Sequence, residues 1–417
     1  MKRVQFAGGG FEPPTQGRAP MGEPSTLASK RARAARLLGV RGLRTASIAV
    51  AVLAAPLLSG PGALAADPSW SVVSSPNPST EAGLSGVSCT SSSFCIGVGV
   101  YENASAERTF AERWNGSSMS LVTAAPAAGY SETELNGISC VSTSFCVAVG
   151  RYYKAGADHM ILDKWNGTAL VSMPVPHIFG PGATVDLYGV SCKGTTFCMA
   201  VGYYTEEPTY PFSLEWNGSA WSQQTVPAPS STTDMQLSGV SCTSASFCMA
   251  VGFNGGDELI VRWNGSTWSI VNDTSSNLSP AAVRCRSTTF CMAVGTSYSG
   301  GPNVNSLAEE WNGSTWSVLT SPNVSGQSTW LQSVSCTGSA FCMASGYSAD
   351  TLLDTDSTLS ELWNGTTWSI VSTVNPTSPY DLLPGVSCAA SGGADFCLAV
   401  GQDYNGSVQD TLVEKYS

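Results

Sequence analysis

Apolar and polar residues alternate in short segments along most of the chain, and the segments recur in one order. In one representative unit they cover Leu237–Cys242, Phe247–Phe253, Leu259–Trp263 and Trp268–Val271. Alternation with a period of two over four to eight residues predicts β-strands that bury one face. The pattern therefore predicts an all-β chain whose units each contain four strands.

The second segment of this unit separates large side chains from small ones. Phe247, Met249 and Val251 fall on one face of the predicted strand, whereas Cys248 and Ala250 fall on the other. A sheet with one bulky face and one small face can pack against a copy of itself. We therefore expect neighbouring units to stack large against small, with the methionines filling the core.

An Asn-Gly pair separates the third and fourth segments in six units. The pairs begin at Asn115, Asn166, Asn217, Asn264, Asn312 and Asn364. Asn-Gly between strand patterns is a strong hairpin signal, because a type I′ turn needs positive φ at both central residues. We therefore expect type I′ hairpins at these positions.

A pair of cysteines marks every unit, and successive pairs begin 43 to 52 residues apart. The pairs are Cys89 with Cys95, Cys140 with Cys146, Cys192 with Cys198, Cys242 with Cys248, Cys285 with Cys291, Cys336 with Cys342 and Cys388 with Cys397. A period of about 50 residues is typical of one four-stranded propeller blade. The sequence predicts a seven-bladed β-propeller with four-stranded blades and one hairpin disulfide per blade.

The two ends of the repeat region complement each other. The last unit stops at Ser417, where the other units continue into a fourth strand, and an unmatched strand pattern around Trp70 precedes the first unit. We therefore expect the N-terminal strand to close the ring by completing the last blade. A linear β-solenoid or a string of small disulfide modules is the less favoured alternative, because about 50 residues are few for an independent core.

Residues 1–66 do not share the repeat. Basic residues cluster over Lys30–Arg44, an apolar run covers Ala46–Leu58, and small residues end the segment at Ala66. This order is typical of an export signal that is cleaved near Ala65 or Ala66. A retained membrane anchor is less favoured, because the apolar run is short and contains Pro56. We expect residues 1–66 to be an export segment, with a start at Met21 as an alternative, and 67–417 to be a secreted propeller without stable membrane insertion.

The net charge and the cysteine content limit which classes of ligand, metal or cofactor the chain is expected to bind. The formal net charge is −11, and without the basic residues 1–66 it is about −18, which disfavours nucleic acid as a ligand. All 14 cysteines belong to the pairs, which in an exported chain indicates disulfides. A metal site is disfavoured, because only His159 and His177 are available and there is no Cys-x-x-Cys. We expect no metal, no cofactor and a monomer.

The phrases SC-x4-FC-x-A-V-G and W-N-G-x-x-W-S resemble a repeat of exported, largely uncharacterised actinobacterial proteins, grouped with kelch-like and galactose-oxidase-like propellers. The chain departs from this repeat at Met119 and Leu170, which replace the second Trp, and at Arg284, which replaces the Ser before Cys285. The resemblance implies a propeller and carries no activity with it.

Binding is expected on the face formed by the second-to-third-strand loops and the links between units. These segments vary and gather aromatic residues beside acids and amides, which suits a carbohydrate or protein ligand. The candidate ligand-binding residues are Trp330, Tyr101, Tyr153, Tyr204, Phe253, Tyr298, Tyr347 and Tyr404. Trp330 stands out because it falls in a predicted link, outside the Trp positions of the repeat. The alternative that these aromatics only pad neighbouring blades stays open.

No catalytic motif of a serine hydrolase, zinc protease or phosphate-binding loop occurs. Acids recur two residues before the end of the third strand, at Glu112, Asp163, Glu309, Glu361 and Glu414, where we expect a structural role. Asp354 and Asp356 form a solvated acidic loop rather than a calcium loop, which would need a central Gly. The sequence favours a secreted, non-catalytic binding scaffold for an extracellular glycan or protein. The alternative is a glycan-active enzyme, a glycoside hydrolase or lyase that uses loop carboxylates.

Overall fold

Every regular element in the described part of the chain is a β-strand. The computed structural model describes residues 68–103, 106–124, 132–176, 178–179, 182–205, 209–229, 234–272, 277–350, 353–376, 379–391 and 394–417. The expected export segment 1–66 and His177 lie outside these residues. Among the residues described, no helix has the length and hydropathy needed to cross a membrane.

The strands repeat in sets of four. The first strands are β2 (Ala82–Ser91), β6 (Glu132–Ser142), β10 (Thr184–Cys192), β14 (Met235–Ser244), β18 (Leu278–Ser287), β22 (Ser328–Gly338) and β26 (Tyr380–Ser391). The second strands are β3 (Phe94–Asn103), β7 (Phe145–Lys154), β11 (Cys198–Thr205), β15 (Phe247–Asn254), β19 (Phe290–Ser297), β23 (Phe341–Asp350) and β27 (Ala394–Tyr404).

The outer half of each set follows the same order. The third strands are β4 (Ala106–Trp114), β8 (Ala157–Trp165), β12 (Thr209–Trp216), β16 (Asp257–Trp263), β20 (Asn305–Trp311), β24 (Thr355–Trp363) and β28 (Gln409–Tyr416). The fourth strands are β5 (Met119–Val122), β9 (Leu170–Ser172), β13 (Trp221–Gln224), β17 (Trp268–Asn272), β21 (Trp316–Leu319), β25 (Trp368–Ile370) and, from the N-terminal end, β1 (Trp70–Val72).

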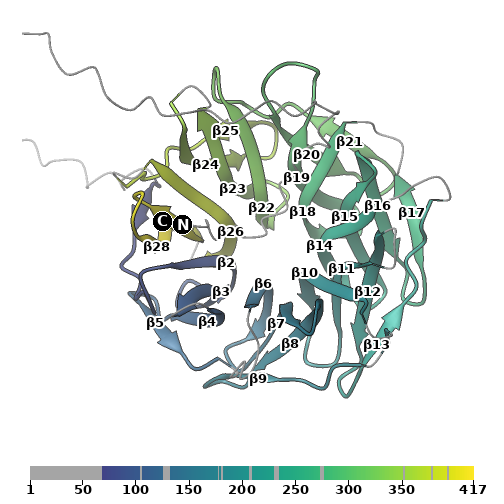
Figure 1. Cartoon of the computed structure of the whole chain (residues 1–417). Helices are drawn as coiled ribbons and strands as arrows, with labels where there is room; N and C mark the ends of the chain where they lie inside the picture. Colours follow the sequence, from purple (N-terminus) through teal and green to yellow (C-terminus); the bar gives the residue numbers. More distant parts are fainter. Residues whose placement is uncertain are drawn as a thin grey trace, which may run out of the picture. The chain divides into compact units, whose positions relative to one another are not determined.

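Each set pairs as an antiparallel sheet in chain order, and the first strands lie innermost (Figure 1). Five sheets are separate, and the sets β22–β25 and β26–β28 are joined by one bridge between Asp356 and Tyr380. The strand β1 pairs with β28, with Trp70 opposite Tyr416. The expected pairing of the strand around Trp70 with the end of the chain is therefore confirmed.

The cysteine pairs form seven disulfides, each within one hairpin between a first and a second strand, as predicted. The bonds join Cys89 to Cys95, Cys140 to Cys146, Cys192 to Cys198, Cys242 to Cys248, Cys285 to Cys291, Cys336 to Cys342 and Cys388 to Cys397. The two cysteines of each bond lie directly opposite each other in the ladder, as in Cys89 and Cys95. No free cysteine remains among the described residues. So many disulfides are typical of an oxidising, extracellular environment.

The last disulfide closes a longer hairpin than the others. Cys388 and Cys397 are nine positions apart in the sequence, whereas the cysteines of the six other bonds are six apart, as in Cys140 and Cys146. The ladder between β26 and β27 nevertheless places Cys388 opposite Cys397, and it continues beyond them to Ser391 opposite Ala394. The three additional residues therefore lengthen the hairpin without moving the disulfide from its place in the sheet.

The Asn-Gly hairpins differ from the predicted type I′ turns. Only the glycine adopts positive φ, about +101° at Gly116, and no Asn of these six turns is among the residues with positive φ. The side chain of Asn115 instead accepts hydrogen bonds from the backbone N–H groups of Ser117 and Ser118. The prediction of type I′ geometry is therefore wrong, because Asn acts here through its side-chain carbonyl, which closes a longer four-residue loop between Trp114 and Met119.

The core lies between the sheets, where large residues of one sheet meet the small, disulfide-bearing face of the next. Met199 of β11 is clustered with Cys248 and Ala250 of the following sheet. The same arrangement joins the last set to the first, because Leu398 shares a cluster with Cys95. The predicted large-on-small packing is therefore confirmed.

A second series of contacts links the first strands. The Ser before each first Cys accepts a hydrogen bond from the backbone N–H of the first Cys in the following set. These bonds join Ser88 to Cys140, Ser139 to Cys192, Ser191 to Cys242, Ser241 to Cys285, Ser335 to Cys388 and Ser387 to Cys89, at 2.8–3.0 Å. The series is interrupted once, because position 284 is an arginine.

The strand β1 offers a direct test of its contribution to stability. Trp70 is 5% exposed and donates its indole N–H to the Ser360 hydroxyl at 3.0 Å. We expect Trp70→Ala to lower the free energy of unfolding by about 3 kcal/mol, because a large buried ring is removed. Denaturant unfolding of the disulfide-bonded chain measures this. Val72→Ala on the same strand is the control, since Val72 is 49% exposed, and it should change stability little. Equal effects of the two variants would contradict the role of β1.

Candidate functional site

Each first strand pairs with its second strand through one variable pair, and in all but β26 and β27 through one constant pair as well. The constant pair places an apolar residue opposite a glycine, as in Leu135 opposite Gly150. Glycine is required there because a Cβ atom on Gly150 would collide with the carbonyl oxygen of Glu134. The variable pair lies one residue further toward the loops, and we call it the loop-end pair.

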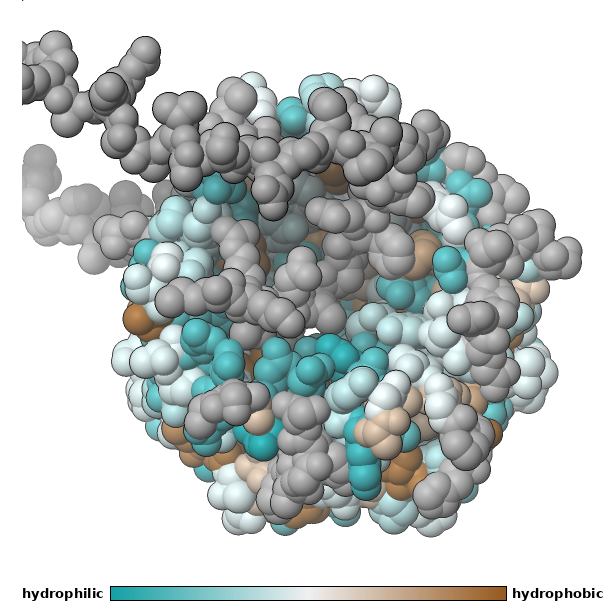
Figure 2. Space-filling model, viewed as in Figure 1, coloured by the Kyte–Doolittle hydropathy of each residue, from teal (hydrophilic) through white to brown (hydrophobic). Residues whose placement is uncertain are grey.

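The loop-end pair differs in every repeat, as does the next pair toward the loops, whereas the pairs on its disulfide side barely change. The seven pairs are Gly83–Val100, Glu134–Arg151, Asp186–Tyr203, Gln236–Phe253, Ser279–Thr296, Trp330–Tyr347 and Leu382–Gln402. Because the first strands lie innermost, these pairs form a series around the centre of the described unit. Figure 2 shows hydrophilic residues gathered around the centre of that view.

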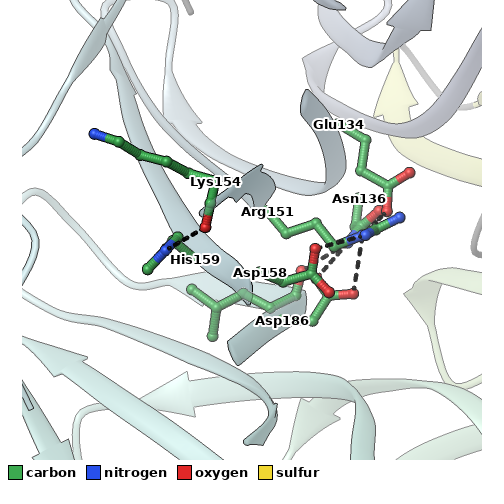
Figure 3. Close-up of polar contacts among 8 residues, drawn as sticks. Glu134, Asn136, Arg151, Lys154, Asp158, His159 and Asp186 are labelled. Atoms are coloured by element: carbon green, nitrogen blue, oxygen red, sulfur yellow. Dashed lines mark hydrogen bonds and ion pairs between the residues drawn. The ribbon is translucent and has the colours of Figure 1, made fainter. Parts of the chain in front are cut away.

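Arg151 is the centre of the most elaborate of these contacts (Figure 3). Its Nε lies 2.6 Å from Glu134 Oε1 and 3.6 Å from Asp186 Oδ2, and its Nη1 lies 2.9 Å from Asp158 Oδ1. Asn136 completes the network by donating from Nδ2 to Asp186 Oδ1 and to the Leu187 carbonyl oxygen, both at 3.0 Å. The network joins two neighbouring sheets, since Asp186 lies on β10 and Arg151 on β7.

The network carries more negative than positive charge. Glu134 and Asp186 are almost fully buried, and Arg151 can offset only one of three carboxylates. Burial raises the pKa of Asp186 well above its usual range, and the Glu134 charge adds to this effect. Burial likewise raises the pKa of Glu134, although Arg151 opposes the change. The exposed edge of the network, formed by Asp158 and Arg151, therefore suits ligands that donate hydrogen bonds to carboxylates.

Two tyrosines extend the network on the next sheet. The rings of Tyr188 and Tyr203 lie 5.7 Å apart. Burial and the nearby charge of Asp186 raise the pKa of both phenols. The two phenols are hydrogen-bonded to each other beside Asp186.

The structure corrects the expected location of Trp330. Trp330 lies within β22, on an innermost strand, rather than in a link between units. Its ring stacks on that of Tyr347 with centroids 4.8 Å apart and an interplanar angle of 10°. The alternation pattern did not reveal the strand this far from Cys336, because the ladder shifts register between Leu331 and Ser333. The stacked pair forms one of the variable loop-end pairs.

The other predicted aromatic residues differ in exposure. Phe253 is only 8% exposed, whereas Tyr153 is 37% exposed. Tyr298 is half-buried after β19. The structure brings Trp330 and Tyr347 together but keeps most of the others in separate repeats. The remaining ring contacts are Tyr101 edge-on against Phe110, Tyr204 stacked on Phe179 and Tyr210, and Tyr404 near Tyr380.

Neither His159 nor the acidic loop forms a metal centre in the described residues. His159 stacks on Tyr152 at 5.1 Å, and its Nε2 lies 3.3 Å from the Lys154 carbonyl oxygen. Asp354 accepts a hydrogen bond from the Tyr380 hydroxyl. Within the described residues, no group of three or more His, Cys, Asp or Glu side chains is arranged to hold a metal ion.

The recurring acids of the third strands are buried, and Glu112, Glu361 and Glu414 bond to the links between sheets. The residues are Glu112, Asp163, Glu309, Glu361 and Glu414, each at most 2% exposed. Ser75, in the link after β1, donates to Glu112 Oε2 at 2.6 Å, and Ser321 donates equivalently to Glu361. The expected structural role is therefore supported, because carboxylates this deeply buried cannot reach a substrate.

Sequence reasoning missed Glu134, Arg151 and Asp186. The sequence did contain a signal for Glu134 and Asp186, because the residue just before the constant apolar residue of each first strand varies between repeats. Aligning the repeats on their cysteines would have shown this position as variable. The contact between Asp186 and Arg151 could not be anticipated in this way, because it joins side chains of different repeats.

No family model and no curated protein matches the sequence. Several solved structures are similar in fold: YCF48 bound to D1 peptide has a TM-score of 0.49 at 11% identity, covering 84% of this chain and 94% of its own. A GH74 xyloglucanase from Xanthomonas campestris has a TM-score of 0.49 at 10% identity, covering 82% and 55%. The SapL1 lectin in complex with alpha methyl fucoside has a TM-score of 0.40 at 13% identity, covering 64% and 91%.

These structural neighbours are β-propeller proteins. Similarity at this level assigns neither a ligand nor an activity to this chain. The resemblance of the repeat to exported actinobacterial proteins stays a prediction.

The network around Arg151 predicts that removing the Arg151 charge destabilises the fold by an amount that depends on the protonation of its carboxyl partners. We expect Arg151→Met to destabilise the fold by about 2 kcal/mol at pH 8, because the buried carboxylates lose their counter-charge. The loss should be smaller at pH 5, where Glu134 and Asp186 take up protons more readily. Adding Glu134→Gln should restore part of the stability. Denaturant unfolding at both pH values measures this, with the exposed Arg262→Met as control, and equal losses for the two Arg variants would contradict it.

The third-strand acids predict how stability depends on pH. Burial raises the pKa of Glu112, Glu361 and Glu414 to about 7, above the usual value of 4.5. The folded chain then binds protons more tightly than the unfolded chain, so this contribution is complete below about pH 4.5 and is lost as the pH rises through about 7. We expect the free energy of unfolding to fall between pH 5 and pH 8, and Glu361→Gln to reduce that fall. A constant or rising stability over this range would contradict the assignment.

Proposed function

We propose that the chain is a seven-bladed β-propeller, closed by β1, that is exported and binds a carbohydrate or protein ligand without chemical turnover. Closure is supported by contacts between the last and first sets. Ser387 accepts a hydrogen bond from the Cys89 backbone N–H, and Val400 packs in one cluster with Leu84. Export is supported by the seven disulfides and by the basic and apolar character of residues 1–66.

The single observation that carries the binding proposal is the variation of the loop-end pairs. The pairs lie between a constant apolar–Gly pair and the loops, on strands whose backbone is nearly the same in every repeat. If these positions served packing alone, they would be filled alike, as the disulfide pairs are. Instead, the pair is charged in some repeats, aromatic in others and small in others. Such variation is typical of a surface that discriminates among ligands.

The chemistry of these pairs suggests the class of ligand. The stacked rings of Trp330 and Tyr347 offer an apolar platform, and Asp158 and Arg151 offer charged hydrogen-bond partners at partly exposed positions. A sugar ring or an aromatic side chain of a peptide can stack on such a platform while its hydroxyl or amide groups meet the carboxylates. The net negative charge of the chain favours neutral or cationic ligands.

The enzyme alternative rests on the carboxylates of the Arg151 network. Glu134 and Asp186 have raised pKa values, as a general acid would need. Both, however, are engaged with Arg151 and lie almost fully buried, so neither is placed against a substrate. Binding without turnover therefore accounts better for the geometry.

Screening residues 67–417 against a glycan array and a set of immobilised peptides tests this function. Once a ligand is found, Trp330→Ala should weaken its affinity by about 1–3 kcal/mol, because a stacking platform is lost. Val318→Ala is the control, since Val318 is exposed on an outer strand, and it should leave affinity unchanged. Unchanged affinity after both Trp330→Ala and Tyr204→Ala would place the site elsewhere. Release of glycan fragments that is abolished by Glu134→Gln would replace binding by catalysis.

A further inference from the structure

The first strands carry the loop-end pairs at one end and the disulfides at the other. Three of the few basic side chains of the repeat region lie at the disulfide-bearing ends. Arg284 and Arg286 lie two residues apart near the end of β18, and Arg286 occupies the point where the ladder shifts register between Cys285 and Ser287. Lys193 directly follows β10. The Cys242 backbone N–H donates to Ser191 Oγ and the Cys285 backbone N–H donates to Ser241 Oγ, and these two bonds hold β10, β14 and β18 at one level. The three cations therefore belong to the same end of the innermost strands β10 and β18, between which β14 lies.

Arg284 occupies a position at which the six other first strands have serine. Those serines each accept a hydrogen bond from the next strand, and Arg284 offers no acceptor to the backbone N–H of Cys336. The Nε of Arg284 is moreover buried without a hydrogen-bond partner. Losing one hydrogen bond and burying an unsatisfied donor each cost stability. Residues that break the local pattern at such a cost are expected at functional sites.

The cations have no counter-charge of their own. Burial lowers the pKa of Lys193, and the charges of Arg284 and Arg286 lower it further. Burial also lowers the pKa of Arg284 to about 10, with a contribution from Arg286. None of the three forms an ion pair within the described residues. The one acid in the disulfide loops, Asp395, accepts a hydrogen bond from the Thr337 hydroxyl.

We propose that Lys193, Arg284 and Arg286 bind a phosphate group at the disulfide-bearing ends of the innermost strands. Guanidinium groups bind tetrahedral oxyanions through paired N–H donors, and a lysine adds a point charge. A bound phosphate would accept from the unsatisfied Nε of Arg284 and relieve the repulsion among the three cations. This site is separate from the loop-end pairs, which lie at the other ends of the same strands.

Arg284→Ser is a sharp test, because serine is the residue of the other six strands and restores an acceptor for Cys336. Calorimetric titration of residues 67–417 with inorganic phosphate measures binding at constant ionic strength, set with chloride. The unmodified chain should bind phosphate, and Arg284→Ser should weaken binding at least about tenfold while keeping or raising thermal stability. Arg286→Gln, at an exposed position, should weaken binding without affecting the fold. Arg262→Ser is the control and should bind phosphate like the unmodified chain.

Two further titrations identify the source of the phosphate. Glucose 6-phosphate compared with glucose tests whether the group is bound as an ester, and sulfate tests whether any tetrahedral oxyanion suffices. Tighter binding of the ester than of inorganic phosphate supports a phosphorylated ligand, whereas equal binding supports the free ion. Absence of phosphate binding at millimolar concentration, or equal binding by Arg284→Ser, would overturn the proposal.

Discussion

The structure depends on one contact, the packing of a bulky strand face against the small, disulfide-bearing face of the next sheet. Phe, Met and Val of one second strand fill the space that Cys and Ala leave on the neighbouring one. Each sheet has one bulky face and one small face, so the same packing contact can repeat from sheet to sheet. It also joins the last set of strands to the first. The disulfides occupy the small face and so belong to the packing surface itself, besides closing their hairpins.

This packing leaves few positions free to vary. The disulfide pairs, the constant apolar–Gly pairs and the buried third-strand acids all serve contacts between or within sheets. On the innermost strands, variation gathers at the loop-end pairs, at the residues beyond them toward the loops, and at single exceptions such as Arg284. The two proposed sites follow from this division, since each uses positions at which the repeat departs from its own pattern. They lie at opposite ends of the innermost strands and differ in charge: carboxylates predominate around Arg151, whereas Arg286 and Lys193 are the charged residues that affect the pKa values near Arg284.

Much of the fold follows from the sequence because its determinants are local. Cysteine spacing, strand alternation and the unmatched strand at Trp70 each depend on residues close together in one repeat. The Asn-Gly turns were mistaken in geometry, because Asn can close a turn through its side chain as well as through positive φ. Trp330 was misplaced where the ladder shifts register. The Arg151 network was missed because Asp186 and Arg151 come from different repeats, and the proximity of such residues depends on how whole sheets pack.

The central claim is that a ligand is bound by the variable pairs while the repeated scaffold holds them in place. Amide hydrogen exchange of residues 67–417, with and without a ligand found by screening, tests it most directly. The account predicts slower exchange at Glu134–Arg151, Asp186–Tyr203 and Trp330–Tyr347 together, since one ligand would span several innermost strands, and little change at the Asn-Gly turns. Protection confined to the outer strands, or to the loops of a single repeat, would contradict it.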